Sequence, residues 1–110
     1  MHELAIMESV VDAVLDHTGD RTVTTVRLRV GRLAGVVTDS LRFCFELVTA
    51  GTTLEGASLE IEAPAGAAHC RTCGADVALD TVFALCECGS ADVEIVSGRE
   101  LCVSSVDVVS

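Results

Sequence analysis

The chain has 110 residues, the size of one domain or of one domain with a small satellite. Half of the residues are hydrophobic and the formal charge is −10, which predicts a packed core and argues against a basic face for nucleic-acid phosphates. The absence of Trp and Tyr leaves little for base stacking, and no apolar run approaches the roughly 18 residues that a membrane span requires.

The first segment, residues 3–17, has the periodicity of an amphipathic helix. Gly19 follows the last apolar turn and is expected to end it. A second, acidic stripe of Glu8, Asp12 and Asp16 is interpreted as a solvated face. The expected core face consists of Leu4, Met7, Val11, Val14 and Leu15.

Residues 23–33 and 57–63 alternate as two strands. The outward side chains are basic on the first (Arg27 and Arg29) and acidic on the second, so we expect the strands to be sheet neighbours. The acidic pair is Glu60 and Glu62.

A second helix is predicted between these strands. It begins near Thr38, and Gly51 ends it. Its expected core side chains are Leu41, Phe45 and Val48.

Pro64 marks the point where the chain leaves this sheet, and residues 92–109 are again β-rich. The predicted fold is mixed α/β, of the α+β kind. Two helices lie on a roughly three-stranded sheet, with an inserted zinc-ribbon-like module of four cysteines. The expected domains are 1–64 plus 93–110, and 65–92.

Four of the six cysteines form two close pairs, Cys70 with Cys73 and Cys86 with Cys88. Two facing pairs offer four thiolates to a tetrahedral ion, which predicts a structural zinc site. A redox CxxC is the alternative, but that chemistry uses one pair at the start of a helix. The single residue between Cys86 and Cys88 predicts a tighter loop and distorted angles at the metal.

Three further residues bear on this module. Cys44 lies in an apolar helical run and Cys102 on a strand, and we expect both to be buried, inert thiols. His69 is either a substitute ligand or an outer hydrogen-bond donor, and we favour the outer position or no role at all.

The first three residues, Met1, His2 and Glu3, place several metal-binding groups in one short segment. A bulky second residue protects the initiator Met, so the free amine is expected to belong to Met1. That amine, the amide nitrogen and imidazole of His2 and the carboxylate of Glu3 form a nitrogen-rich set that suits Ni(II) or Cu(II).

The sequence as a whole resembles the HypA family, the nickel metallochaperones of nickel–iron hydrogenase maturation. The resemblance spans nearly the whole chain, and its specific part is the opening triplet together with the cysteine pairs. In the family the second pair is normally CxxC, so the spacing of Cys86 and Cys88 departs from the pattern. The other segments that carry the resemblance are Leu4-Ala5, Val30-Gly31-Arg32-Leu33, Leu41-Arg42-Phe43 with Phe45-Glu46, and Ser97-Gly98-Arg99-Glu100-Leu101.

The resemblance implies a two-part protein that is not an enzyme. Its α/β domain would bind nickel through Met1, His2 and Glu3, and Cys70, Cys73, Cys86 and Cys88 would hold a structural or regulatory zinc. The implied partners are a HypB-type GTPase and the hydrogenase large subunit, with urease served by some members. No nucleic acid and no membrane is expected. The acidic first twenty residues are unlike a secretion signal, which favours the cytoplasm.

Two other functions compete with this interpretation. A zinc-ribbon interaction module, including one for nucleic acid, is disfavoured by the acidic charge and the few aromatic residues. An enzyme is disfavoured because the three histidines are far apart in the sequence and no nucleophile motif or P-loop is found.

Overall fold

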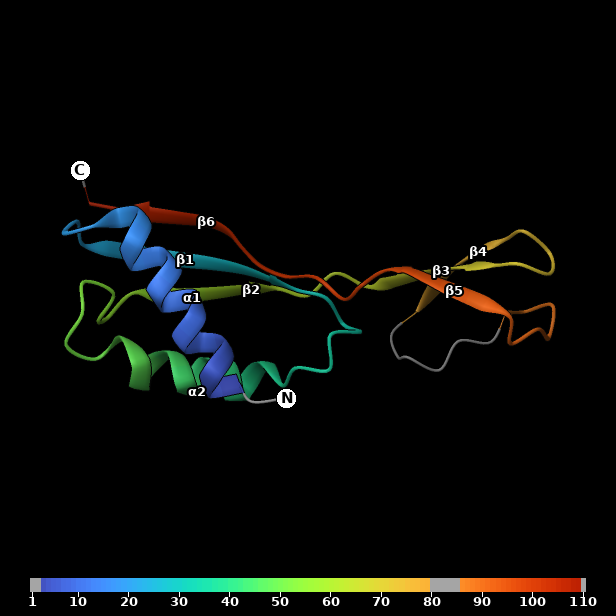
Figure 1. The fold of residues 1–110 in the computed structure, drawn as a ribbon, viewed down its shortest axis with the longest axis horizontal. Helices are drawn as coiled ribbons and strands as arrows, with labels where there is room; N and C mark the ends of the chain where they lie inside the picture. Colours follow the sequence, from blue (N-terminus) through green and yellow to red (C-terminus); the bar gives the residue numbers. More distant parts are fainter. Residues whose placement is uncertain (1–2, 80–85, 110) are drawn as a thin grey trace. The chain divides into compact units, whose positions relative to one another are not determined.

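The computed structural model describes residues 3–79 and 86–109, which divide into two compact units. The first unit contains the chain up to Arg29, Val36–Glu62 and the chain from Cys102 onward, and the second contains Val30–Gly35 and Ala63–Leu101. Neither described helix is long and apolar enough to cross a membrane. The elements, labelled in Figure 1, are α1 (Glu3–Thr18), β1 (Val23–Val30), α2 (Thr38–Thr49), β2 (Ser58–Glu62), β3 (Gly66–Cys70), β4 (Asp76–Leu79), β5 (Val93–Ser97) and β6 (Leu101–Val108).

The first unit is built on a sheet of strand order β2-β1-β6. β1 and β2 are parallel, and their register places Arg27 opposite Glu60 and Arg29 opposite Glu62. Nε of Arg27 lies 3.2 Å from Oε1 of Glu60, and Nε of Arg29 lies 3.7 Å from Oε2 of Glu62. The pairing predicted from opposite charges is therefore confirmed.

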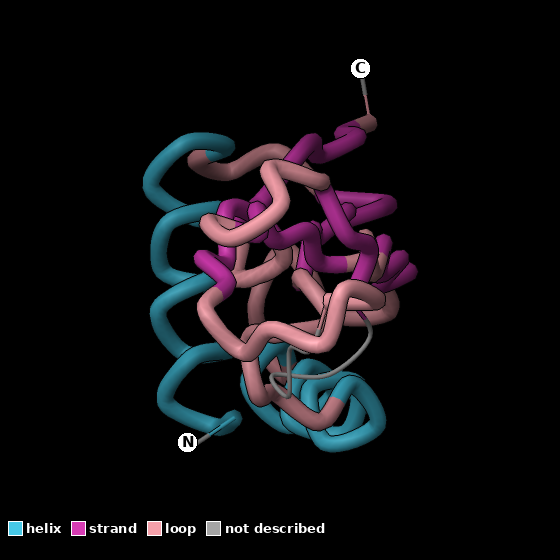
Figure 2. Tube along the Cα trace, turned by 90° about the vertical axis from the view of Figure 1, so that its right-hand side faces the viewer, coloured by secondary structure: helices cyan, strands magenta, loops and turns pink. Residues whose placement is uncertain are grey.

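The helices of the first unit pack against each other, and they cross rather than run side by side (Figures 1 and 2). The predicted stripe of α1 is buried at Met7, Val11 and Val14. From α2, Leu41 and Phe45 are buried as predicted, and β1 contributes Val26 and Leu28.

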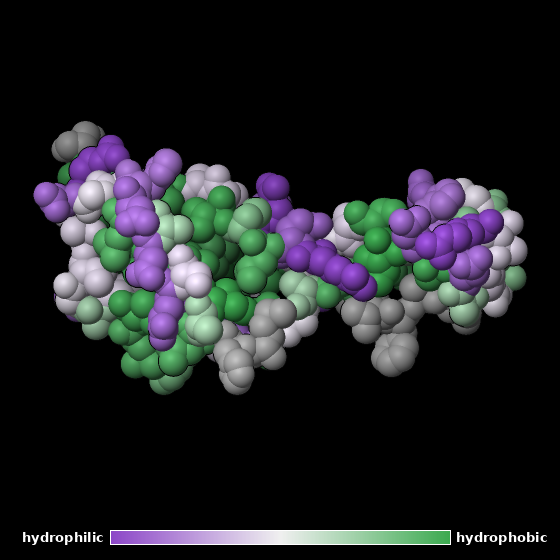
Figure 3. All heavy atoms as spheres, in the orientation of Figure 1, coloured by the Kyte–Doolittle hydropathy of each residue, from purple (hydrophilic) through white to green (hydrophobic). Residues whose placement is uncertain are grey.

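The prediction for Leu4 is wrong, because its side chain is 46% exposed. With Phe43 and Leu47 of α2 it belongs to the exposed large hydrophobic residues, and Figure 3 shows apolar surface over this helical layer. Periodicity identifies the apolar face of a helix, but it does not say how far along the helix the neighbouring elements extend.

β6 returns to the first sheet, as predicted for the end of the chain. The N–H of Val109 donates to the carbonyl of Thr22, and the hydroxyls of Thr24 and Ser104 donate to the carbonyls of Asp107 and Arg27 respectively. These partners run in opposite directions, so β6 is antiparallel to β1. Cys102 of β6 is exposed rather than buried, which corrects the prediction for that thiol, because it lies where the strand enters the edge of the sheet.

The second unit is built on an antiparallel sheet of strand order β4-β3-β5. Its small core joins Leu33 to Ala68 and Leu79. The N–H groups of Gly31 and Leu33 donate to the carbonyls of Glu100 and Gly98, each at 2.7 Å.

This unit is larger than the expected 65–92 module. The segments 30–35 and 93–101 pack within it, because β5 pairs with β3 and Leu33 fills its core. Local sequence patterns carry no signal for either of these distant contacts.

Candidate metal centre

The four clustered cysteines meet at one point of the second unit. Their Sγ atoms all lie within 4.8 Å of one another, with 3.8 Å between Cys70 and Cys88 and 3.5 Å between Cys73 and Cys86. A tetrahedral ion with metal–sulfur bonds of about 2.3 Å separates its sulfurs by about 3.8 Å. The two distances between sulfurs of different pairs are therefore close to those of a tetrahedral thiolate site, and the other sulfur–sulfur distances are at most 4.8 Å.

Two tight turns, each closed by a glycine, bring the sulfurs together. The N–H of Gly74 donates to the carbonyl of Cys70 and the N–H of Gly89 to that of Cys86, at 2.9 and 2.8 Å. Both glycines have positive φ, +78° and +91°, which other residues rarely adopt. The cysteine pairs thus sit on turns that require glycine at the position after the second cysteine.

The backbone of the first turn points N–H groups at sulfur. The N–H of Cys73, and to a lesser extent that of Thr72, lowers the pKa of the Cys70 thiol to about 6, against the opposing effect of burial. The pKa of Cys73 is raised: the N–H of Ala75 lowers it, but hydrogen bonding with the Cys86 and Cys70 thiols and burial outweigh that effect. Four crowded thiols ionise together only when a cation compensates their charge, so the site is chemically suited to a divalent metal.

Polar contacts connect the first cysteine turn to the second. The hydroxyls of Thr72 and Ser90 lie 2.8 Å apart, and Nη1 of Arg71 donates to Asp92 at 2.8 Å. These residues were not singled out from the sequence, where small polar residues beside cysteines carry no distinctive pattern.

His69 makes its contact elsewhere. Its Nδ1 lies 3.0 Å from Oδ1 of Asp76, and it is not part of the sulfur cluster. Cys44, expected to be buried, is half-buried on α2.

The predicted nickel ligands lie at the start of the chain. Met1 and His2 fall outside the described residues, and Glu3 is the first residue of α1, where it is half-buried. An acidic residue in the first turn also stabilises a helix through its dipole.

Comparison with known proteins decides the family. The family model described as "Hydrogenase/urease nickel incorporation, metallochaperone, hypA" matches residues 1–108. The chain belongs to the HypA family. A hydrogenase maturation factor HypA of Streptomyces avermitilis is 48% identical, over 96% of this chain and 86% of that protein. One of Chlorobaculum tepidum is 46% identical, over 98% of this chain and 99% of that protein.

A solved structure shares the fold. The solution structure of the nickel metallochaperone HypA from Helicobacter pylori has a TM-score of 0.68 to this chain, at 19% identity, and covers 100% of this chain and 99% of its own. The family and the mixed α/β architecture with a four-cysteine module are therefore confirmed.

Proposed function

We propose that this chain is a nickel metallochaperone that binds Ni(II) at its N-terminus and delivers it for nickel–iron hydrogenase maturation, while its four cysteines hold a structural zinc. Membership of the HypA family supports the delivery role. The observation that carries the zinc proposal is the spacing of the four sulfurs, which matches a closed tetrahedral thiolate site.

The nickel ligands are proposed to be the amine of Met1, the amide nitrogen and imidazole of His2, and the carboxylate of Glu3. This set joins adjacent residues in fused chelate rings, and nitrogen donors suit Ni(II). The same ligands hold copper more tightly, so selectivity must come from geometry, metal supply and the receiving partner.

The proposed partners follow from the family rather than from any surface of the molecule. They are a HypB-type GTPase, the hydrogenase large subunit and, for delivery to urease, the urease accessory proteins. The proposed compartment is the cytoplasm, where free thiols stay reduced and available to zinc.

A paired metal titration tests the nickel site. Intact mass first establishes that Met1 is retained, and nickel affinity and zinc content are then measured for three chains. His2→Ala is expected to weaken nickel binding by more than about tenfold, because imidazole is the strongest neutral ligand of the set. A Gly-Ser extension before Met1 is expected to weaken it as well, since an amine with a pKa near 8 becomes an amide.

Zinc content is expected to stay at one per chain in both variants. His17→Ala is the matched control, because it removes an imidazole near the other end of α1 without touching the proposed ligands. Unchanged nickel affinity in the extended chain would show that the amine is not a ligand. Unchanged affinity in His2→Ala would move the nickel to His69 or to the cysteines.

A further inference from the structure

The two edges of the first sheet differ in how they are protected. β2 is short, carries two exposed glutamates, and has one carbonyl, that of Leu59, covered by Nη1 of Arg42 at 2.7 Å. β6 spans Leu101–Val108, contains no proline and no basic residue, and its single charge, Asp107, is paired with Arg27 at 2.8 Å. Short, charged or covered strands are the usual defences against edge pairing, and β6 lacks them.

The backbone of β6 is available for pairing on its outer side. The N–H of Val109 donates to Thr22, so it faces β1. Because successive residues of a strand alternate, the N–H and C=O groups of Val106 and Val108 face away from β1. β6 is the last strand in the order β2-β1-β6, so no described strand takes up these groups.

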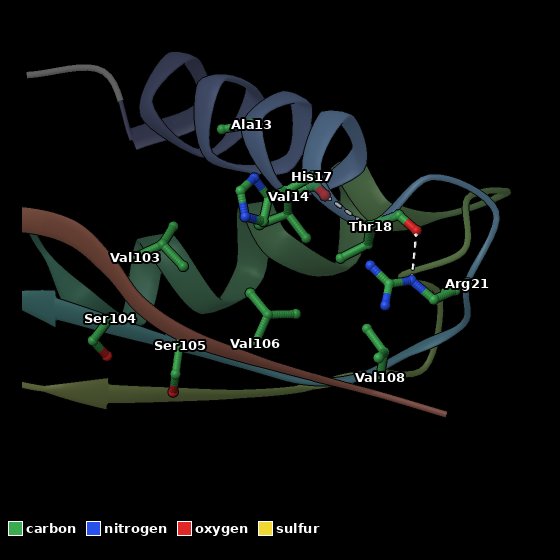
Figure 4. A pocket seen from close by; sticks show the side chains of 10 residues that line it. All are labelled: Ala13, Val14, His17, Thr18, Arg21, Val103, Ser104, Ser105, Val106 and Val108. Atoms are coloured by element: carbon green, nitrogen blue, oxygen red, sulfur yellow. Dashed lines mark hydrogen bonds between the residues drawn. The ribbon is translucent and has the colours of Figure 1, made fainter. Parts of the chain in front are cut away.

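A groove of about 490 Å³ lies beside this edge, between the last turns of α1 and β6. Figure 4 shows Val103, Val106 and Val108 of β6 pointing toward α1, whereas Ser104 and Ser105 point away. Two consecutive side chains on one side of a strand indicate a local bulge. The floor of the groove is therefore a row of valines, which favours aliphatic side chains.

The guanidinium of Arg21 places a positive charge at the α1 side of the groove, beside the imidazole of His17. Nε of Arg21 donates to the carbonyl of Thr18 at 3.2 Å (Figure 4). That bond covers a carbonyl at the end of α1 and uses only Nε, so the two terminal nitrogens of the guanidinium remain able to donate to a ligand. Within residues 3–79 and 86–109, Arg21 makes no ion pair, in contrast to Arg27 and Arg29 on the opposite face of the sheet.

We propose that the outer edge of β6 is a docking site for an extended acidic–aliphatic peptide segment of a partner protein. The segment adds as a strand beside Val106 and Val108, its alternate aliphatic side chains enter the valine-lined groove, and a carboxylate faces Arg21 and His17. An open strand edge selects an extended backbone, and the guanidinium of Arg21 at the groove, which has no carboxylate partner among the described residues, selects a carboxylate at that one position. The site lies wholly within the first unit and uses none of the proposed metal ligands.

The test uses the full chain and a synthetic probe, the acetylated and amidated peptide Glu-Thr-Val-Thr-Val-Glu. A glutamate at each end serves either strand direction. In a ¹⁵N-edited NMR titration, the peptide is expected to shift the amide signals of Val106, Val108 and Arg21. Arg21→Gln is expected to weaken binding by about two- to fivefold, the usual effect of one exposed ion pair. Arg29→Gln removes the same charge from the other face and is expected to leave the affinity unchanged.

Two altered peptides separate backbone pairing from charge attraction. Glutamine in place of both glutamates is expected to weaken binding as Arg21→Gln does. Methylation of the valine and threonine amides is expected to abolish it, because those N–H groups pair with the edge. Full binding of the methylated peptide, or shifts that spread over both units, would overturn the proposal. So would signals of Val106 and Val108 that move with protein concentration alone, which would assign the edge to a second copy of this chain.

Discussion

Gly31→Ala is a demanding test of how the second unit is held together. A Cβ atom at residue 31 would lie 2.0 Å from the carbonyl oxygen of Gly98 and 2.9 Å from the backbone nitrogen of Arg99. Both neighbours are backbone atoms, so no side-chain rotation relieves the overlap. The segment that begins at Gly31 must therefore move away from Gly98, and Leu33 moves with it.

The expected cost follows from the contacts that this movement breaks. The hydrogen bonds from Gly31 to Glu100 and from Leu33 to Gly98, each 2.7 Å long, contribute about 1 kcal/mol apiece. Leu33 is only 5% exposed, and its removal from the core costs about 1.5–3 kcal/mol. Gly31→Ala should therefore destabilise the second unit by about 4 kcal/mol.

Amide hydrogen exchange is the suitable assay, because the chain has no Trp or Tyr for fluorescence. In the zinc-loaded chain, exchange at Ala68 is expected to accelerate strongly, while Leu28 in the first unit keeps its protection. Gly35→Ala is the matched control on the same segment. Its φ of +73° costs an alanine about 1 kcal/mol, and nothing lies within 4 Å of the added Cβ. Equal effects of the two substitutions at Ala68 would refute the reasoning.

Three further expectations follow from other contacts. Cys73→Ala should lower zinc affinity by more than about 100-fold, which exceeds the usual effect of removing a residue that only hydrogen-bonds a ligand. Cys102→Ala should leave zinc affinity unchanged, and competition with a chromophoric chelator measures both variants. The hydrogen bond from Arg27 lowers the pKa of Asp107, so this pair stabilises the fold above the ordinary Asp pKa, and the stabilisation is lost as the pH falls through the lowered value. Arg27→Gln should return the pKa of Asp107 toward 3.8, which a pH titration of its carboxyl ¹³C shift measures. Leu28→Ala should destabilise the first unit by about 2–5 kcal/mol in urea unfolding followed by circular dichroism, since Leu28 is fully buried.

The first unit shows what local patterns are able to predict. Alternation located β1 and β2, and the opposite charges of Arg27 and Glu60 predicted their pairing, because cross-strand neighbours interact directly. The prediction that Leu4 and Cys102 are buried is wrong, because a hydrophobic side chain favours burial but does not determine which element covers it.

The second unit shows where such patterns fail. The spacing of the cysteines predicted their convergence, because a cysteine pair and the glycine after it encode a turn locally. Gly31 and Gly98 approach closely although they are far apart in the chain, and the local sequence around either glycine does not predict this contact. Both segments that contain these glycines carry the family resemblance in the sequence, and in the structure they are joined by the hydrogen bonds from Gly31 to Glu100 and from Leu33 to Gly98.

The geometry of the sulfur cluster bears on where a transported ion is held. A tetrahedral ion bound by all four of these cysteines would have no ligand position open to an incoming donor. Such a site retains its ion and stabilises the fold around it, because its binding free energy is also folding free energy. A protein that delivers nickel must instead exchange ligands one at a time with the receiving site. The proposed site at Met1, His2 and Glu3 uses adjacent residues, so a partner is able to replace its donors stepwise without unfolding the second unit.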